Sequence, residues 1–433
     1  MFCFFSITFI YYSLLLLYIF RKQGLSIAAC MVGVYMVTSF LSIFLYHFTD
    51  SFEEFTISVA PAIMYCIVPT LVIWPFYRFN SNIKREISCN NTRVFDILSY
   101  IVIGCFVFSV LFYASDLLYL RNVGLDIGSL RGDEDYLARG SQSQSSGILR
   151  MISSICNAIG SMSSISLILC FYSICFMKRK AWFNALLFLS SMSCIIVGIV
   201  SIDRSIIFYW IIRLIFIFVM FIPYFSKQTR RIITISSLGI LGIVGIYLIV
   251  LTLSRFGSES INSILYYFGQ NYLYFCWYWD NYVPPVTNYG FFCPIISHFF
   301  LDWGYPVDAV PFGLLVSDSV GYFVNVFYTF MGSIMLYLGK SWIVPLSMVF
   351  IILTLLFIRK DNKITLYDLI FVFLWAQIPY CGVILYLYTE YVYAMGFMFV
   401  LLYCIWARRR EGAQGLKESS GPFVYHIIEE KKE

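Results

Sequence analysis

Long apolar segments, separated by short polar ones, make up most of this chain of 433 residues. A helix crosses the hydrocarbon core of a bilayer with about 20 apolar residues, and each segment has roughly that length. The segments are 2–20, 25–46, 56–77, 97–115, 148–176, 181–200, 205–224, 232–253, 341–358, 366–387 and 390–406. The pattern predicts an all-α polytopic membrane protein with 11 transmembrane helices.

A further apolar segment, 323–338, would raise the number of spans to 12. Counting it as a span would place the basic residues after 358 and after 407 on the outer side. Its interior contains Asn325, Thr329, Gly332 and Ser333. Because irregular backbone at membrane depth is tolerated beside protein or a wet cavity, we expect this segment to be interfacial or re-entrant.

Composition agrees with a membrane protein: 60% of residues are hydrophobic, 12% are charged and the mean hydropathy is +0.81. These values exclude a soluble globular protein. The alternate loops 21–24, 78–96, 177–180, 225–231 and 359–365, with the tail from Arg408, carry 21 of the 29 basic residues. Because basic residues concentrate in cytoplasmic loops, these loops are predicted to be cytoplasmic and the N-terminus to lie outside.

We therefore expect residues 1–410 to form a single integral membrane domain and 411–433 a cytoplasmic tail. Two outer loops are long, 116–147 and 254–340, and the second is expected to carry short helices. The 13 cysteines form no CxxC pair and no Cys/His cluster at metal-ligand spacing. The sequence thus predicts no metal site.

The larger outer loop mixes aromatic with acidic side chains between residues 254 and 322. Sugar rings stack their apolar faces on aromatic rings, and their hydroxyls bond to carboxylates and amides. Tyr266, Trp277, Trp279 and Asp280 are therefore candidate glycan-binding residues. The alternative is an amphipathic cover, because Tyr and Trp are enriched at bilayer interfaces whatever the function.

A transfer reaction onto a sugar hydroxyl needs a base to take the proton of that hydroxyl. His298 is the one histidine of the large loop, and a histidine titrates near neutral pH. The carboxylates of Glu259, Asp280, Asp302 and Asp308 compete for the same role. A structural role for His298 is the alternative.

Eight basic residues lie outside the cytoplasmic loops, and seven of them are arginines. A guanidinium grips phosphate with two parallel hydrogen bonds, so these arginines are candidates for holding a phosphorylated ligand. Arg204 lies in a very short turn between two spans, beside Asp203, and Arg255 follows the eighth span. We expect Arg204, Arg255 and Arg121 to bind a diphosphate. Arg131 and Arg139, which flank three acids at 133–135, are expected to form salt bridges.

Arg213 lies near the middle of the span 205–224, where an ionisable residue is costly and marks a possible intramembrane site. Nine residues at 100° each place it on the helix face opposite Arg204. Two roles for Arg213 are left open by the sequence: it forms a buried ion pair, or it lines a deep wet cavity.

Energy for the reaction would have to arrive inside the substrate. The chain has no Walker A loop, no GxGxxG before a helix and no HExxH. We expect no cofactor and no nucleic-acid partner. A lipid-linked diphosphate sugar meets the need, because cleavage of its sugar–phosphate bond drives transfer.

Three stretches carry a resemblance to a known family. They are the turn Ser201–Ser205 with its Ser-x-x-Arg-Ser centre, the Asn-x-x-x-Thr stretch Asn325–Thr329 followed by Gly339, and Arg121 separated from Gly132 by ten residues. They resemble the O-antigen or oligosaccharide repeat-unit polymerases, the Wzy-like family. An aspartate-glycine element usual before the late span reads Leu338-Gly339-Lys340 here, which leaves the role of that segment open.

The resemblance implies a GT-C-like, all-helical glycosyltransferase on the outer face of the bacterial cytoplasmic membrane. It implies transfer of a growing glycan from undecaprenyl diphosphate to another lipid-linked repeat unit, with Arg204 as a diphosphate ligand. The resemblance leaves open whether a separate chain-length regulator binds to the protein. A ligase for finished glycan and a flippase for lipid-linked glycan are the alternatives.

Overall fold

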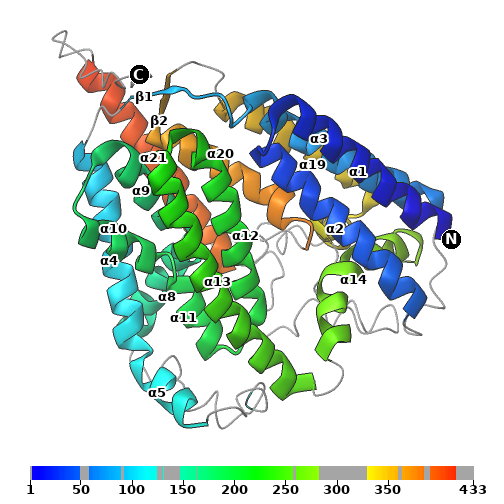
Figure 1. The fold of residues 1–433 in the computed structure, drawn as a ribbon, viewed down its shortest axis with the longest axis horizontal. Coiled ribbons are helices and arrows are strands. Elements are labelled where there is room, and N and C mark those ends of the chain that lie inside the picture. Colours follow the sequence, from blue (N-terminus) through cyan, green and yellow to red (C-terminus); the bar gives the residue numbers. More distant parts are fainter. Residues whose placement is uncertain are drawn as a thin grey trace.

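The computed structural model describes residues 2–48, 58–88, 92–123, 130, 147–162, 164–256, 260–281, 329–358, 363–384 and 391–415. These residues are almost entirely helical (Figure 1). The two strands among them, β1 (Glu86–Ser88) and β2 (Lys363–Thr365), pair in parallel over three residues each. The fold is therefore a helical bundle.

One group of helices packs around the N-terminal hairpin and lies to the right in Figure 1. It consists of α1 (Phe2–Gln23), α2 (Ile27–Phe48), α3 (Val59–Phe79), α14 (Ser260–Asn281), α18 (Thr329–Leu338) and α19 (Ile343–Phe357). Its centre is a set of stacked tyrosines, with the rings of Tyr65 and Tyr272 4.0 Å apart. Helices that are distant in sequence thus share one core.

A second group lies to the left in Figure 1. It consists of α4 (Thr92–Phe112), α5 (Ala114–Val123), α8 (Gly147–Ser161), α9 (Ser164–Tyr172) with a π-helical turn (Ser173–Met177), α10 (Ala181–Ser190), α11 (Ser193–Val200), α12 (Arg204–Phe221), α13 (Lys227–Phe256) and α21 (Tyr391–Gly415). Short 3₁₀ turns follow α12 at Ile222–Tyr224 and precede α19 at Lys340–Trp342.

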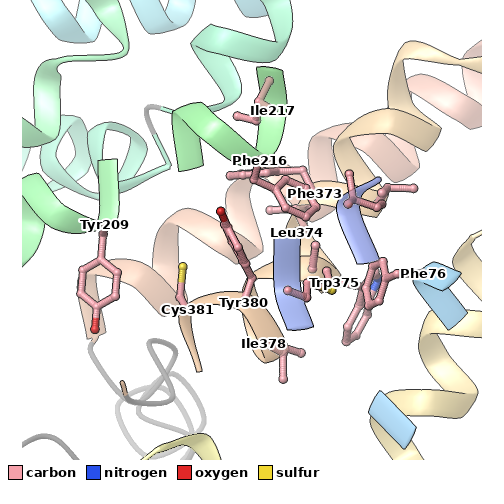
Figure 2. Packing of buried hydrophobic residues seen from close by; sticks show 14 of the residues in the cluster. Phe76, Tyr209, Phe216, Ile217, Phe373, Leu374, Trp375, Ile378, Tyr380 and Cys381 are labelled. Carbon is pink, nitrogen blue, oxygen red and sulfur yellow. The ribbon is translucent and has the colours of Figure 1, made fainter. Parts of the chain in front are cut away.

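Helix α20 (Leu366–Cys381) joins the two groups, and all 16 of its residues are buried. It contacts α2, α3 and α19 on one side and α9, α12 and α21 on the other. On the α12 side, Figure 2 shows Phe373 and Tyr380 against Phe216, whose ring centroid lies 4.9 Å from that of Tyr380. On the other side, the Tyr35 hydroxyl donates to the carbonyl of Pro379 at 2.9 Å.

The start of α20 is set by local hydrogen bonds. Thr365 and Asp368 form a capping box, in which each side chain accepts from the other residue's backbone N–H. Thr365 also ends β2, so the strand pair fixes where the helix begins. This local order explains how an apolar helix buried on all sides keeps one register.

Eight helices among the described residues are long and apolar enough to cross a membrane, and nine if α8 and α9 form one bent span. Together with the apolar composition, they make this an all-α, multi-pass membrane protein. All 11 segments expected from the sequence contain helix. The exact number of spans stays a prediction, because α20 and the apolar part of α21 are shorter than 18 residues.

Helix α18 corresponds to the second half of the segment expected to be interfacial or re-entrant. Its ten residues are all buried. At about 1.5 Å per residue it is roughly 15 Å long, about half a bilayer core. Its length is in keeping with a non-spanning element, although the preceding residues, 282–328, lie outside the described parts.

Candidate functional site

The turn before α12 places Arg204 at the first position of that helix. Asp203 is the N-cap, and its carboxylate accepts from the backbone N–H of Ser205 at 2.9 Å and from its hydroxyl at 2.7 Å. Ile202 has a φ of +53°, which is unusual for a β-branched residue. The described bonds of Asp203 thus cap the helix. Together with the strained turn, they fix the start of α12 and therefore the backbone position of Arg204.

A small apolar contact brings three arginine-bearing segments together. The side chains of Leu120 and Ile202 are each 2% exposed and form one small cluster, against which Tyr247 of α13 packs. Leu120 precedes Arg121 on α5, and Ile202 lies two residues before Arg204.

Tyr247 lies on the same helix as Arg255, which belongs to the last turn of α13. Eight residues separate the two, or about 12 Å along the helix. Helix α13 continues to Phe256, so Arg255 is helical, and it lies beyond the candidate span Lys227–Tyr247, as expected from the sequence. The structure therefore gathers the segments of Arg121, Arg204 and Arg255, which we call the arginine corner.

Within the arginine corner, the side chain of Arg121 is described and is exposed. The side chains of Arg204 and Arg255 lie outside the described parts, so their clamp on one diphosphate stays a prediction. The same holds for the candidate catalytic residues, since Glu259, His298 and Asp302 lie outside the described residues.

Helix α14 belongs to the outer loop 254–340 and is longer than the short helices expected there, whereas α18 of the same loop is short. Helix α14 has 22 residues, and it packs lengthwise on α2. A Cβ on its Gly269 would lie 2.8 Å from the carbonyl oxygen of Leu41, which shows how closely the two helices approach. Trp277 is 7% exposed and belongs to the core.

The other candidate glycan-binding residues have mixed surroundings. Tyr266 and Trp279 are half-buried, and the Lys340 ammonium lies 5.9 Å from the Trp279 ring centroid. Asp280 is exposed, and its carboxylate accepts from the N–H and the hydroxyl of Ser58 at 2.8 and 2.7 Å. Ser58 is the N-cap of α3, so Asp280 ties the end of α14 to the start of α3.

We predict that Asp280→Ala lowers the thermal unfolding temperature in detergent. The change removes both bonds to Ser58, at a cost of about 1 kcal/mol, typical of losing a helix cap. Ser58→Ala removes only the hydroxyl bond and should cost less. Unchanged stability of Asp280→Ala, with weakened glycan binding, would instead assign Asp280 to the substrate.

A second polar cluster lies inside the bundle, around Arg213 of α12. This side chain is 1% exposed, and its Nη1 donates to the carbonyl oxygen of Ser161 at 3.1 Å. Its Cζ lies 5.9 Å from the ring centroid of Tyr209 and 5.5 Å from that of Tyr393. The thiol of Cys381 lies beside the guanidinium. Figure 2 shows Tyr209 and Cys381 projecting from α12 and α20.

The backbone is broken where Arg213 binds. Helix α8 ends at Ser161, and α9 continues at an angle of 58° to it. On α20, the helix ends at Cys381, and the carbonyls of Gly382 and Ile384 accept from Phe330 and Thr329 at the start of α18. Broken helices at membrane depth place carbonyl groups inside the protein, where a cation can bind them.

Several polar atoms around this break lack partners. The Asn157 Oδ1, Gln377 Oε1 and Tyr209 hydroxyl are buried and have no hydrogen-bond partner among the described residues. Each such atom costs about 1–3 kcal/mol. Polar groups kept at this cost inside a membrane protein make this region a candidate functional site. The sequence singled out Arg213, but nothing in its spacing pointed to Asn157 or Gln377.

No family model matches this chain, and no curated protein and no solved structure matches it. Function must therefore be inferred from this chain's own residues and from the short motifs described above. Two regions offer charged groups for it, the arginine corner and the cluster around Arg213.

Proposed function

We propose that this protein is a membrane glycosyltransferase that polymerises oligosaccharide repeat units carried on undecaprenyl diphosphate. The observation that supports it best is the packing of Leu120, Ile202 and Tyr247, which gathers the three arginine-bearing segments. In this proposal the reaction takes place on the outer face of the bacterial cytoplasmic membrane. The N-terminus is then outside, and the C-terminus is cytoplasmic.

The arginine corner suits a lipid diphosphate in charge and in chemistry. A diphosphate ester carries negative charge on oxygens that accept paired hydrogen bonds from guanidinium groups. Arg204 and Arg255 lie at the ends of the apolar helices α12 and α13, and Arg121 lies on the short helix α5 that follows the apolar α4, where a lipid head group would reach them. The polyprenyl chain would extend along the helices, and the glycan would extend away from the membrane.

The transfer step needs a base for the attacking hydroxyl and a stabilised leaving group. His298, Glu259 and Asp302 remain the candidates for the base. The new bond joins the acceptor oxygen to the anomeric carbon, and the bond from that carbon to the phosphate oxygen breaks. The diphosphate then leaves, and the arginines stabilise its negative charge. No metal or further cofactor is needed for this balance.

Deletion of the gene in its native host tests the proposal. We expect lipid-linked single repeat units to accumulate and the ladder of long polysaccharides to disappear. A strain that still makes long chains on the lipid carrier, without passing them on, would indicate a ligase. An unchanged ladder together with normal lipid-linked intermediates would exclude both enzymes.

A flippase for the lipid-linked glycan is a second candidate, favoured by one observation. The α8–α9 pair is bent by 58° next to the buried Arg213, and broken helices at mid-membrane depth are typical of transporters. The two functions differ in whether a membrane is needed. Purified protein that lengthens glycans in detergent is a polymerase, whereas a flippase moves its substrate across vesicle membranes without lengthening it.

A further inference from the structure

Arg213 joins the ends of helices that belong to different parts of the chain. Its guanidinium binds the last carbonyl of α8, lies beside the last side chain of α20 and faces the ring of Tyr393 on α21. Gly396, one turn after Tyr393, lets α21 approach α8 so closely that a Cβ there would lie 2.2 Å from the carbonyl oxygen of Ala158. The contact at Arg213 is thus part of a tight junction of helices.

The charge of Arg213 is suited to this junction. A helix carries roughly half a negative charge at its C-terminus, and α8 ends at the carbonyl that Arg213 binds. Helix α20 ends at Cys381, beside the same guanidinium. The carbonyl end of α8 offsets about half a unit of that positive charge. A fixed cation therefore stabilises the break between α8 and α9.

The same residue fixes the position of α12 relative to its neighbours. Arg213 follows Arg204 by nine residues, about 13 Å along one helix. Between them, the indole N–H of Trp210 donates to the Ser191 hydroxyl at 3.2 Å. The Tyr380 hydroxyl donates to the carbonyl of Ile212 at 3.0 Å. Arg213 adds the one charged contact described along this stretch, and it resists both sliding and rotation of α12.

We propose that Arg213 is a positioning residue of the transferase. By binding the end of α8, it sets the height and rotation of α12 and thereby the place from which Arg204 reaches the lipid diphosphate. The inference rests on the proposed function, and it assigns Arg213 no contact with the substrate.

A double-mutant cycle between Arg213 and Arg204 tests this role with reconstituted protein and a lipid-linked repeat unit as the substrate. We expect Arg213→Gln to slow elongation roughly 10- to 100-fold in the wild-type background. In the Arg204→Lys background, the same change should slow it by less than about 3-fold, because the group that it positions is already altered. The drop in unfolding temperature should be the same in both backgrounds.

The controls separate this inference from weaker explanations. Arg179→Gln breaks the exposed pair with Asp96, 2.8 Å long, and should change elongation by less than about 2-fold. If Arg213→Gln fails to fold, Arg213→Lys takes its place in the cycle. Lysine keeps the charge but loses the planar fork that fixes the contact to α8, so a smaller loss with the same non-multiplying pattern is expected. Multiplying losses, or full activity of the Arg213 variant, would overturn the inference. A wild-type protein without elongation activity would overturn the proposed function instead.

Discussion

Replacing Arg204 by lysine is expected to slow glycan elongation roughly 10- to 10⁴-fold while the protein still inserts and folds. Lysine keeps the positive charge but loses the planar fork that holds two phosphate oxygens at once. One or two lost charge-assisted hydrogen bonds, at about 1.5–3 kcal/mol each, account for this range if they act in the transition state. The measurement is the length of the polysaccharide ladder and the amount of lipid-linked repeat unit at matched membrane expression.

Arg131→Lys is the matched control on the outer side, because the neighbouring acids need only its charge. It should leave the ladder nearly unchanged. A normal ladder from Arg204→Lys would remove the clamp and leave Arg204 as a residue of topology or ion pairing. Loss of the protein from the membrane would show that Arg204 is needed for folding, contrary to the expectation.

The helices themselves could be predicted from the sequence because a membrane helix needs only a long apolar segment. The segments 25–46 and 205–224 correspond closely to α2 and α12. Capping residues sharpen such ends, as Asp203 does for α12. Local composition and local hydrogen bonds therefore determine where these helices begin and end.

Breaks inside an apolar segment could not be predicted in the same way. The segment 148–176 is apolar enough overall to predict one span, yet the structure bends it by 58° after Ser161. A break costs hydrogen bonds, and partners far along the chain replace them, here Arg213 on α12. The hydrophobic pattern of α8 and α9 contains no record of that partner.

In helix α14, residues that were predicted to lie on a surface are buried instead. Its polar and aromatic residues predicted a surface for sugars, but Tyr272 and Trp277 lie in the core of the N-terminal group. The Tyr272 hydroxyl shares a hydrogen bond of 2.8 Å with Thr8, from the other end of the sequence. Polar side chains can be buried when a residue distant in the sequence forms a hydrogen bond with them. A single sequence does not reveal which residues form such bonds.

Of the candidate site, the sequence identified the arginines but not how they meet. Arg121, Arg204 and Arg255 were selected by residue type and by position outside the cytoplasmic loops. The segments that carry them are brought together by Leu120, Ile202 and Tyr247, three ordinary apolar or aromatic residues. Such long-range packing is decided by the whole bundle, so structure is needed to find it.

Gly396→Ala is expected to destabilise the protein by about 1–3 kcal/mol, or more if the helices have to separate. The added Cβ would lie 2.2 Å from the Ala158 carbonyl oxygen and 2.8 Å from the Ser161 hydroxyl. A backbone carbonyl cannot turn away as a flexible side chain can. Helices α21 and α8 must therefore move apart, which also disturbs the carbonyl that Arg213 binds. Thermal unfolding in detergent measures the loss.

Gly239→Ala on α13 is the matched control, since it makes the same chemical change in an apolar helix. A Cβ at Gly239 has no neighbour within 4 Å. Alanine is the better helix former by about 1 kcal/mol, so this variant should be as stable as the wild type or slightly more stable. If both variants lose stability equally, helix backbone effects and not the approach of α21 to α8 explain the result. If neither does, α21 can shift without cost, and the junction around Arg213 is looser than its contacts imply.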